Sequence, residues 1–464
     1  MWTGRAMWPW VGRMLAALLA LLLGFEPALA QNIRTLRDAE MEDFLHEIMR
    51  PVFIAAGVTP ESVQFVIVDD PSLNAFYAGG TAIFLHTGVF LQTDNVNQVI
   101  GVLAHETGHM TGGHVQRFDE IAAPATAMSI LGLLLGAAAI AAGAPADAGV
   151  GIITGGQTAA QRTALKFRRV QEASADQAAA QFLQNAKLSG KGLIEVFEKF
   201  RFEQLMVAPN LDPYIVSHPL SSDRIAHLEE RLKASPYWDK PVDPAAEARY
   251  ERIKAKLIGY IFPAKATLGR YPASDRSVPA RYARIYAYNK MMEWDEAMAE
   301  ADSLIAEDPS DPYFREIKGQ ILLENGHVDE AIPELAKAAE YAPHQTLILT
   351  LYGQALAAKE EPETDAKAAE VLERAAALDP HNAFAWYLLA TIYTRDGKQP
   401  LADLAAAERF LLMQNVQQAA AFASRAAEKL PAGTPKWYRA QDIRQIAGGM
   451  LLDSDGRDRR SRRQ

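Results

Sequence analysis

Residues 93–109 read TDNVNQVIGVLAHETGH, and this stretch decides how the first half of the chain folds. Thr93-Asp94-Asn95 offers a helix N-cap, and the apolar residues at 99, 102 and 103 recur at the spacing of one helix face. On the same predicted helix, His105 and His109 stand four residues apart. Both imidazoles therefore share a face and can bind one metal ion.

Glu106, which directly follows His105, gives this predicted metal site a catalytic character. Glu106 lies one position round the helix from His105, where its carboxylate can reach a water molecule on the ion. Catalytic zinc takes three protein ligands and leaves a fourth position open. A metzincin pattern would place a histidine at position 115, but that residue is Val115 and the nearby histidine is His114. The third ligand is therefore expected from a later helix.

A pair of acidic residues further along the chain can supply that ligand. Glu172 and Asp176 are four residues apart, which places both on one face of a helix. Glu172 can ligate zinc, while Asp176 can accept a hydrogen bond from a ligating imidazole. The alternative is an acidic pair on a solvated surface, which leaves the two histidines without a third ligand. Imidazole and carboxylate ligands predict one zinc ion per chain, although they also suit other divalent ions.

Two short β-rich runs precede the metal-site helix. Val63, Phe65 and Ile67 alternate in the first run, and the second run, Thr81 to Leu85, follows Gly79-Gly80. Two short strands that lead into a long helix predict an α+β domain, mostly helical with a small sheet, over residues 31–265.

An apolar segment from Ser129 to Ala142 lies between the metal-site helix and Glu172. It is rich in glycine and alanine, and two interpretations remain open. The segment is either a buried core helix or a mobile lid or hairpin that touches a membrane, with Gly143 to Gly156 as a hinge.

The second half of the chain shows only helix patterns. It follows Pro263 to Pro279, a stretch that suits a linker or a boundary loop. Pro309, Pro343 and Pro380 then recur at intervals of 34 and 37 residues. Small residues recur between these prolines, namely Gly319, Ala331 and Ala338, then Gly353, Ala368 and Ala375. This pattern predicts an all-α solenoid of tetratricopeptide repeats over 280–435, the alternative being an unrelated alanine-rich bundle.

Four stretches carry a resemblance to a known family. In chain order they are Asn74-Ala75-Phe76 with Gly79-Gly80, His105 to His109, Glu172 to Asp176, and His218-Pro219 with Arg224. With these stretches, residues 40–235 resemble the HtpX/BepA-like family of gluzincin zinc metallopeptidases. Together with the repeats, nearly the whole chain is similar to the periplasmic members of this family that carry tetratricopeptide repeats.

The resemblance implies roles for several residues. Glu172 would be the third zinc ligand, and Asp176 the residue that is usually labelled proton donor. The family also implies that Thr81 to Leu85 is an edge strand that pairs with extended substrate, the alternative being an edge covered by a loop. The implied substrate-binding residues are Asn74, Gly80, Thr81, Ala82, Ile83 and Phe84.

His218 and Arg224 have roles that the sequence leaves open. Arg224 can stabilise the oxyanion of the reaction or form a structural ion pair. His218 can be a surface residue, a donor to the oxyanion, or a fourth zinc ligand. Pro219 biases His218 toward an extended backbone, which suits a side chain aimed from a loop. We expect His218 to act as a switch, bound to zinc at rest and released when a partner docks on the repeats.

The N-terminal segment of the chain predicts export, and the C-terminal end predicts a tail. Arg5 and Arg13 precede the apolar run Met14 to Gly24, and Ala28-Leu29-Ala30 ends a signal peptide over residues 1–30, with cleavage after Ala30. The alternative is an uncleaved membrane anchor, but the apolar run is short for a span. Zero cysteines suit an oxidising compartment, and a net charge of -10 argues against nucleic acid. Residues 450–464 predict a disordered basic tail.

These patterns predict an exported zinc endopeptidase, and the family resemblance implies that it is periplasmic. Its expected substrates, implied by the family, are misfolded or stalled outer-membrane proteins, and its repeats would contact the outer-membrane assembly machinery. Two alternatives remain. One is a chaperone-like protein that assists the assembly of outer-membrane proteins with little proteolysis. The other is a repeat scaffold with a structural metal site. A peripheral membrane contact through 129–142 is also expected.

Overall fold

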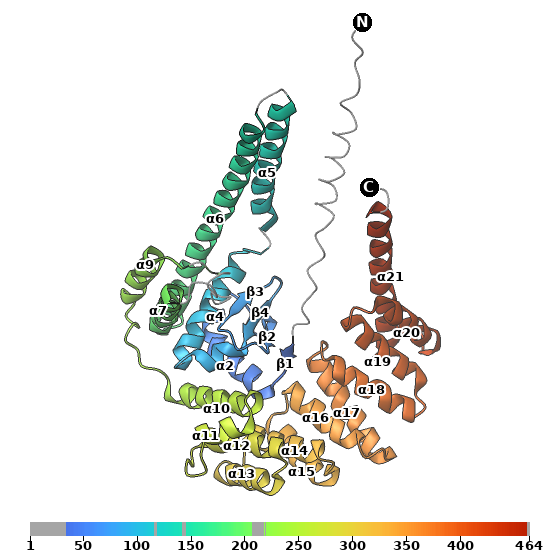
Figure 1. Ribbon diagram of the computed structural model, residues 1–464. Coiled ribbons are helices and arrows are strands. Elements are labelled where there is room, and N and C mark those ends of the chain that lie inside the picture. Colours follow the sequence, from blue (N-terminus) through green and yellow to red (C-terminus); the bar gives the residue numbers. More distant parts are fainter. Residues whose placement is uncertain (1–33, 116–117, 142–144, 207–217, 219, 462–464) are drawn as a thin grey trace.

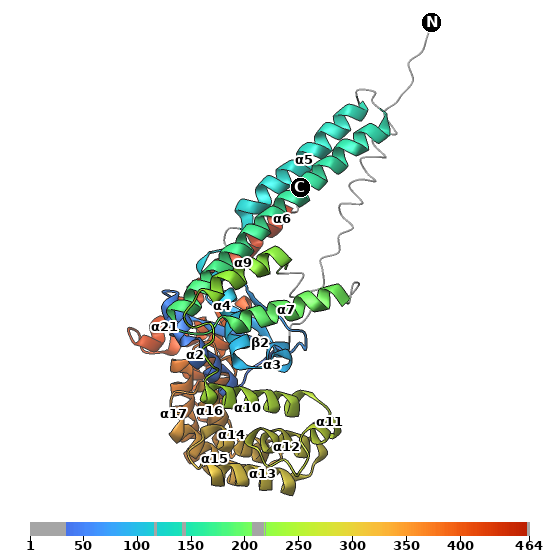
Figure 2. The same cartoon turned by 90° about the vertical axis from the view of Figure 1, so that its left-hand side faces the viewer.

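A computed structural model describes residues 34–115, 118–141, 145–206, 218 and 220–461 of the chain (Figure 1). The expected signal peptide lies outside these residues. The chain is mostly helical with one small sheet, as the sequence predicts. Figures 1 and 2 show a compact part around the sheet, a long two-helix hairpin that projects from it, and a curved succession of helices below it.

The sheet contains four strands in the order β1-β2-β4-β3. They are β1 (Thr35–Leu36), β2 (Gln64–Val68), β3 (Ala75–Tyr77) and β4 (Ala82–His86). In β4, Phe84 lies opposite Val66 of the parallel strand β2 and opposite Phe76 of the antiparallel strand β3. The expectation that Thr81 to Leu85 forms an edge strand is therefore wrong, because β3 covers β4. A strand of only three residues is too short to show an alternating pattern in the sequence.

The helices of the compact part pack around this sheet. They are α2 (Ala39–Ala55), η1 (Pro60–Ser62), α3 (Thr87–Gln92), α4 (Val96–Thr111), α7 (Lys191–Met206) and α9 (Ser222–Lys233). Helix α4 begins where the sequence predicts, since the Asn95 side chain accepts a hydrogen bond from the backbone N–H of Gln98. A Cβ atom at Gly108 would lie 2.6 Å from the carbonyl oxygen of Ala175. Glycine therefore lets α4 approach the helix that carries Glu172.

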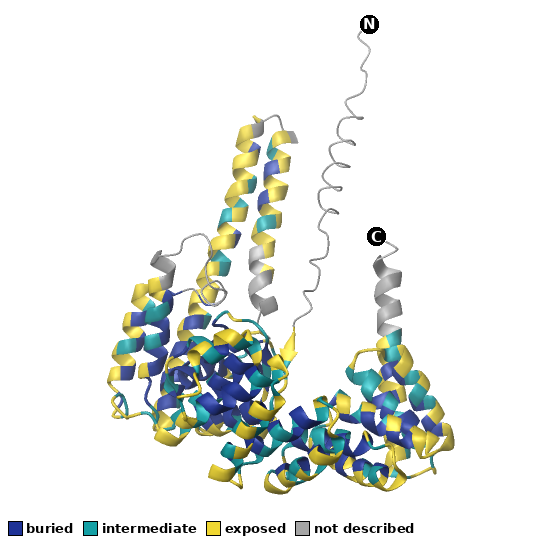
Figure 3. Cartoon of the chain, turned by 60° about the horizontal axis from the view of Figure 1, so that its bottom comes forward, coloured by how far each residue is buried: buried dark blue, intermediate teal, exposed yellow. Residues whose placement is uncertain are grey.

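That helix is α6 (Ala146–Asn185), which forms the projecting hairpin with α5 (Phe118–Ala141). The two helices meet through glycines, because a Cβ atom at Gly132 would lie 2.8 Å from Cα of Gly156. Most described residues of the hairpin are exposed (Figure 3). The interpretation of 129–142 as a buried core helix is therefore wrong. Of the helices in the described part of the chain, none has the length and apolar character needed to cross a membrane.

Helix α10 (Pro244–Ile261) joins the compact part to the second half. Its Tyr250 is buried in the core of the compact part, and its Gly259 lies against Ala283 of α12 (Val278–Met291). The stretch from Pro263 to Pro279 is not simply a loop, since it contains α11 (Ala264–Arg270), which packs on α12. The two halves therefore share packed helices at their boundary.

A buried cluster of charges lies at this boundary. Glu40 of α2 is fully buried and forms ion pairs with Arg252 and Lys256 of α10. The Tyr282 hydroxyl of α12 donates a hydrogen bond of 2.9 Å to the Glu40 carboxylate. Arg252 also pairs with Asp311, at 2.6 Å, at the start of the next helix pair. These contacts connect the compact part to the helices that follow.

Consecutive antiparallel helices make up the second half. After α12 they are α13 (Trp294–Glu307), α14 (Pro312–Glu324), α15 (Val328–Tyr341), α16 (Thr346–Ala357), α17 (Pro362–Leu378), α18 (Ala383–Arg395), α19 (Gln399–Leu412), α20 (Val416–Lys429) and α21 (Pro435–Ser461). At the recurring glycines the helices touch closely, because a Cβ atom at Gly319 or Gly353 would lie 2.5 Å from the side chain of Leu335 or Leu372.

The expected disordered tail is helical over most of its length, since α21 continues to Ser461. The reason lies in helix propagation, which costs little once a helix has started at Pro435 and packed its first turns.

Candidate metal centre

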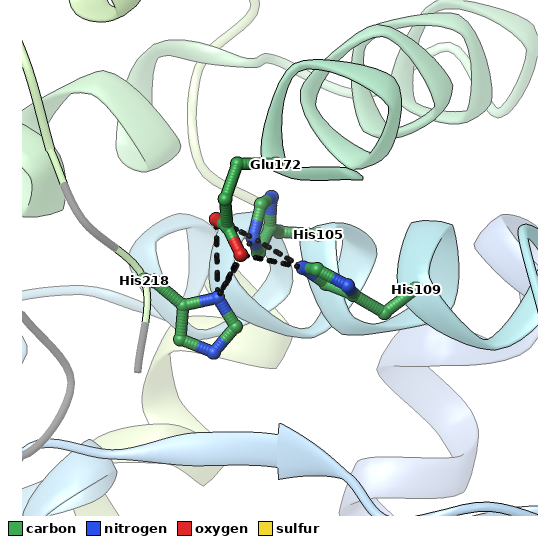
Figure 4. Close-up of side chains that lie close together, drawn as sticks. All are labelled: His105, His109, Glu172 and His218. Carbon is green, nitrogen blue, oxygen red and sulfur yellow. Dashed lines mark hydrogen bonds and ion pairs between the residues drawn. The ribbon is translucent and has the colours of Figure 1, made fainter. Parts of the chain in front are cut away.

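Three elements bring the candidate metal ligands together (Figure 4). His105 and His109 project from α4, and Glu172 projects from α6. The fourth side chain, His218, comes from the segment before α9. All four side chains are buried, and their ligand atoms lie within 4.8 Å of one another. The structure thus places the three ligands expected from the sequence in one cluster with His218.

The ligand atoms lie close enough together to surround one ion. Nε2 of His105 lies 3.1 Å from Nε2 of His109 and 3.4 Å from Nδ1 of His218. Oxygens of Glu172 lie 3.4 Å from Nε2 of His105, 3.4 Å from Nε2 of His109 and 3.1 Å from Nδ1 of His218. A zinc tetrahedron with bonds of about 2.0–2.1 Å has edges of about 3.3–3.4 Å. The two histidine–histidine distances are close to such an edge, and Glu172 turns both of its oxygens toward the histidines, so the four side chains can surround one ion.

The chemistry of the ligand set also fits a cation. Three imidazole nitrogens and a carboxylate are typical zinc ligands, and a site with three histidines and one acid needs no thiolate. A cation between the lone pairs of the His105 and His109 Nε2 atoms would replace their mutual repulsion by attraction. His105, His109 and Glu172 could therefore hold a zinc ion, with His218 within reach of a fourth position.

A second layer of side chains orients these ligands. Asp176 Oδ1 lies 3.0 Å from Nδ1 of His105, and His114 Nδ1 lies 2.9 Å from Nδ1 of His109. The two imidazoles that bind through Nε2 thus each have a partner for the other ring nitrogen, an arrangement that fixes the tautomer and orientation of metal-ligating histidines.

Arg224 connects the acids of this cluster. Its Nε lies 2.5 Å from one oxygen of Asp176, and another of its nitrogens lies 2.9 Å from Glu172. The guanidinium also stacks on the ring of Phe197, 5.0 Å from the ring centroid. Arg224 lies in the first turn of α9, and its backbone N–H donates a hydrogen bond to the capping side chain of Ser221. Of the two roles open from the sequence, the geometry favours the structural ion pair.

Glu106 faces the cluster from the sheet side of α4. One carboxylate oxygen accepts a hydrogen bond of 3.1 Å from the backbone N–H of Tyr77, in β3. The other oxygen is buried, accepts no hydrogen bond from a described residue, and lies 3.6 Å from Nε2 of His218. This second oxygen is therefore available to a water molecule at the metal centre.

Burial and neighbouring charges set the protonation of the site. Burial raises the pKa of Glu106 above its ordinary value and lowers the pKa of His109 to about 2. Burial opposes ionisation of Glu172, but His218 and His105 lower the pKa of Glu172 well below its ordinary value. A neutral His109 and an ionised Glu172 are the states that bind a metal.

His105 behaves differently from His109. Burial opposes its charge, but hydrogen bonds and charges from Asp176 and Glu172 raise the pKa of His105 to about 9. A proton therefore competes with the metal at His105, and metal binding should release it.

The structure places the expected substrate-binding residues in three different parts of the sheet region. Asn74 lies at the start of β3, beside the site, and its side-chain oxygen is buried without a hydrogen bond from any residue in the described ranges. Ala82, Ile83 and Phe84 lie on the inner strand β4, where their backbone already pairs with β2 and β3. Gly80 and Thr81 lie in the turn between β3 and β4. These positions on β4 therefore cannot offer a free strand edge.

Two residues that contribute to the site, His114 and Tyr77, were not predicted from the sequence. His114 was noticed only as a failed third ligand, although a histidine five residues after His109 can reach back along the helix end. The backbone of Tyr77 has no signal in the sequence, because its contact to Glu106 depends on the short strand β3.

Comparison with known proteins gives matches over both halves of the chain. The model of Peptidase family M48 matches residues 38–232. The chain is 23% identical over 409 residues to the beta-barrel assembly-enhancing protease of Escherichia coli (strain K12), covering 86% of this chain and 81% of that protein. It is 25% identical over 431 residues to the protein of the same name from Yersinia pestis, covering 88% and 81%.

A shorter match covers less than half of the chain. The metalloprotease LoiP of Escherichia coli (strain K12) is 28% identical over 183 residues, which are 38% of this chain and 66% of LoiP. The segment matched by the family model contains every residue of the metal centre, from His105 to Arg224.

Proposed function

Because the chain is a metallopeptidase of family M48, we propose that it is a zinc-dependent endopeptidase of the periplasm that hydrolyses misfolded or stalled outer-membrane proteins. The observation that carries the peptidase assignment is the position of Glu106. One of its carboxylate oxygens accepts no hydrogen bond from a described residue and faces the buried cluster of candidate ligands, next to strand β3.

Each residue of the site has its own role in peptide hydrolysis. When bound, zinc polarises the scissile carbonyl and lowers the pKa of its water. Glu106 accepts the proton of the attacking water and returns it to the leaving amine, which requires an ionised carboxylate at the start. The Tyr77 N–H holds one Glu106 oxygen, so that the other points to the reacting water. Asp176 and His114 keep the two ligating imidazoles in place.

We place the substrate on β3 instead of β4. In the antiparallel pair, Phe76 is opposite Phe84, while the Tyr77 N–H points away from β4 toward Glu106. The outer side of β3 is therefore the outer edge of the sheet among the described strands, on the side of the metal centre. An extended peptide can add to this edge through backbone hydrogen bonds, which do not read side chains and suit varied unfolded substrates.

The substrate class is supported by the relatives. Both relatives are named beta-barrel assembly-enhancing protease, and the match extends over the helix pairs as well as the peptidase domain. We propose that these helix pairs, α12 to α20, are tetratricopeptide repeats that dock the chain on the outer-membrane assembly machinery. Export by a signal peptide cleaved after Ala30 belongs to the same proposal.

A second function is favoured by one observation. Nδ1 of His218 lies among the ligand atoms and can occupy the fourth position of the ion. An ion with four protein ligands is closed in the manner of structural zinc. In this state the chain would bind unfolded outer-membrane proteins and assist their assembly with little cleavage.

One experiment separates the two functions. Bound metal is measured in the purified protein and in the variant Glu106→Gln, and both are incubated with an unfolded β-barrel outer-membrane protein. We expect about one zinc per chain in both proteins and degradation by the wild type alone. Equal degradation by both proteins contradicts the peptidase mechanism, and equal protection against aggregation without degradation supports the chaperone-like function.

A further inference from the structure

Helix α5 presents apolar side chains to solvent between Met128 and Ile140. Between residues 121 and 141 it has no charged residue. Gly132 and Gly136 pack on α6, while the side chains of Ile130 and Leu134, on the opposite face, are 51% and 61% exposed. Leu131, Leu133 and Leu135 are exposed on the flanks. A continuous apolar face of this kind is rare on soluble proteins and usually marks an interaction surface.

Helix α6 carries a group of cations where the hairpin approaches the compact part. Arg162, Lys166, Arg168 and Arg169 are all exposed, and none forms an ion pair with a residue whose position the structure describes. The hairpin from 118 to 170 contains four cations and three acids, whereas the chain as a whole has a net charge of -10. The hairpin therefore has a net charge of about +1, whereas the protein as a whole is acidic. Its four cations lie on the helix that packs beside the apolar face of α5.

This combination favours a phospholipid surface over other partners. Basic residues beside an apolar helix face bind anionic headgroups while the apolar side chains enter the acyl boundary. A second copy of the chain is a poorer partner, because two hairpins packed in parallel would bring the same cations together.

The distribution of polar residues sets the orientation of the hairpin. Asp147 lies in the first turn of α6, at the tip of the hairpin, and a carboxylate is costly in the hydrocarbon region. The exposed side of α6 also carries Thr154 and Gln161. With the hairpin lying flat, α5 faces the lipid and these groups of α6 stay in water.

We infer that the α5–α6 hairpin is a membrane-binding arm that lies along an anionic phospholipid surface, with Ile130 and Leu134 in the lipid and Arg162 and Lys166 at the headgroups. The contact is independent of peptidase activity. Since α6 also carries Glu172, the contact holds the metal centre beside the membrane surface.

Vesicle co-sedimentation tests this inference on the processed protein, whose chain starts after the expected cleavage at Ala30. One set of vesicles contains phosphatidylcholine alone, and the other contains about one quarter phosphatidylglycerol. The variants are Ile130→Gln with Leu134→Gln, and Arg162→Gln with Lys166→Gln. The matched control is Ile54→Gln, an equally exposed isoleucine on α2. Thermal unfolding confirms that each variant is folded.

We expect the wild type and Ile54→Gln to bind the anionic vesicles, with weaker binding in high salt. The Ile130 and Leu134 variant should lose binding by at least about tenfold, because two apolar side chains no longer enter the lipid. The Arg162 and Lys166 variant should lose the preference for anionic vesicles. Absence of binding by the wild type, or binding unchanged in the Ile130 and Leu134 variant, overturns the inference. So does a dimer in light scattering that this variant abolishes, since the face would then bind a second copy.

Discussion

The Asp176 carboxylate lies 3.0 Å from Nδ1 of His105, on the side of the ring opposite the metal ligands. The same carboxylate is held by two nitrogens of Arg224, at 2.5 and 2.8 Å. Burial opposes its charge, but Arg224 and His105 lower the pKa of Asp176 below its ordinary value. Asp176 is therefore an ionised carboxylate that orients a metal ligand, which gives a physical basis to the role that the family resemblance assigns to it.

Replacing Asp176 should weaken zinc binding before it affects the fold. In Asp176→Asn the side chain keeps its shape but loses its charge and its ion pair with Arg224. We expect zinc affinity to fall by about 10-fold to 100-fold, as is typical when such a partner of a ligating histidine is changed. Competition with a chromophoric chelator measures the affinity. Asp223→Asn, at an exposed acid in the first turn of α9, is the control, and equal affinities in the two variants would contradict the role of Asp176.

His218 should restrain the enzyme if it occupies the fourth position of the ion. In His218→Ala this position is open in every molecule, so turnover of an unfolded substrate should rise by roughly threefold to tenfold, according to the fraction of wild-type molecules that are open. Zinc content should remain, since His105, His109 and Glu172 are unchanged. The exposed His227 supplies the control His227→Ala. A lower rate in His218→Ala would instead show that His218 assists catalysis, and it would end the switch hypothesis.

The buried charge cluster at Glu40 should stabilise the contact between the two halves of the chain. Glu40→Gln removes the fully buried acid of the cluster, while Arg252 keeps its ion pair with Asp311 and Lys256 keeps its ion pair with Asp38. The loss should therefore be smaller than the roughly 3–5 kcal/mol that is typical when a buried charge is left without any partner. Thermal unfolding should therefore begin at a lower temperature in this variant. Glu47→Gln removes an exposed acid from the same helix and should have little effect.

The same cluster predicts a dependence of stability on pH. Burial opposes the charge of Glu40, but Arg252 and Lys256 lower its folded pKa below its ordinary value of 4.5. The unfolded chain then binds a proton at a higher pH than the folded chain, so the stabilisation is complete above the ordinary pKa. It is lost as the pH falls through the lowered folded pKa. The difference in melting temperature between the wild type and Glu40→Gln should accordingly shrink below pH 4.5, and a constant difference would contradict this origin.

Local signals in the sequence predict the metal-site helix but not its surroundings. The Asn95 cap and the spacing of His105 and His109 act within one or two helical turns, so they can be read without the fold. Glu40 and Arg252 are 212 residues apart in the chain, and a pattern confined to one segment cannot show that they meet. The strand β3 could not be predicted for another reason. Three residues show too little alternation to distinguish a strand from a loop.

The exposed position of the α5–α6 hairpin could not be predicted from its sequence. An apolar helix rich in glycine and alanine, such as 129–142, has the same composition whether it lies in a core or on an exposed arm. Only its packing distinguishes the two, and here α5 packs almost entirely on α6. The alternatives that the sequence leaves open for this segment are thus decided by tertiary contacts.

The glycine contacts in the hairpin give the last prediction. A side chain at Gly132 would collide with the backbone of Gly156, because a Cβ atom there lies 2.8 Å from Cα of Gly156. Gly132→Leu should therefore separate the two helices and speed proteolytic cleavage of the hairpin. Gly151→Leu is the matched control, because a Cβ atom at Gly151 meets nothing within 4 Å. Zinc content and cleavage of a short peptide should be unchanged in both variants, because Glu172 lies about 24 Å beyond Gly156 along α6. Limited proteolysis followed by mass analysis of the fragments measures the effect, and equal cleavage of the two variants would show that the glycine contacts do not hold the hairpin together.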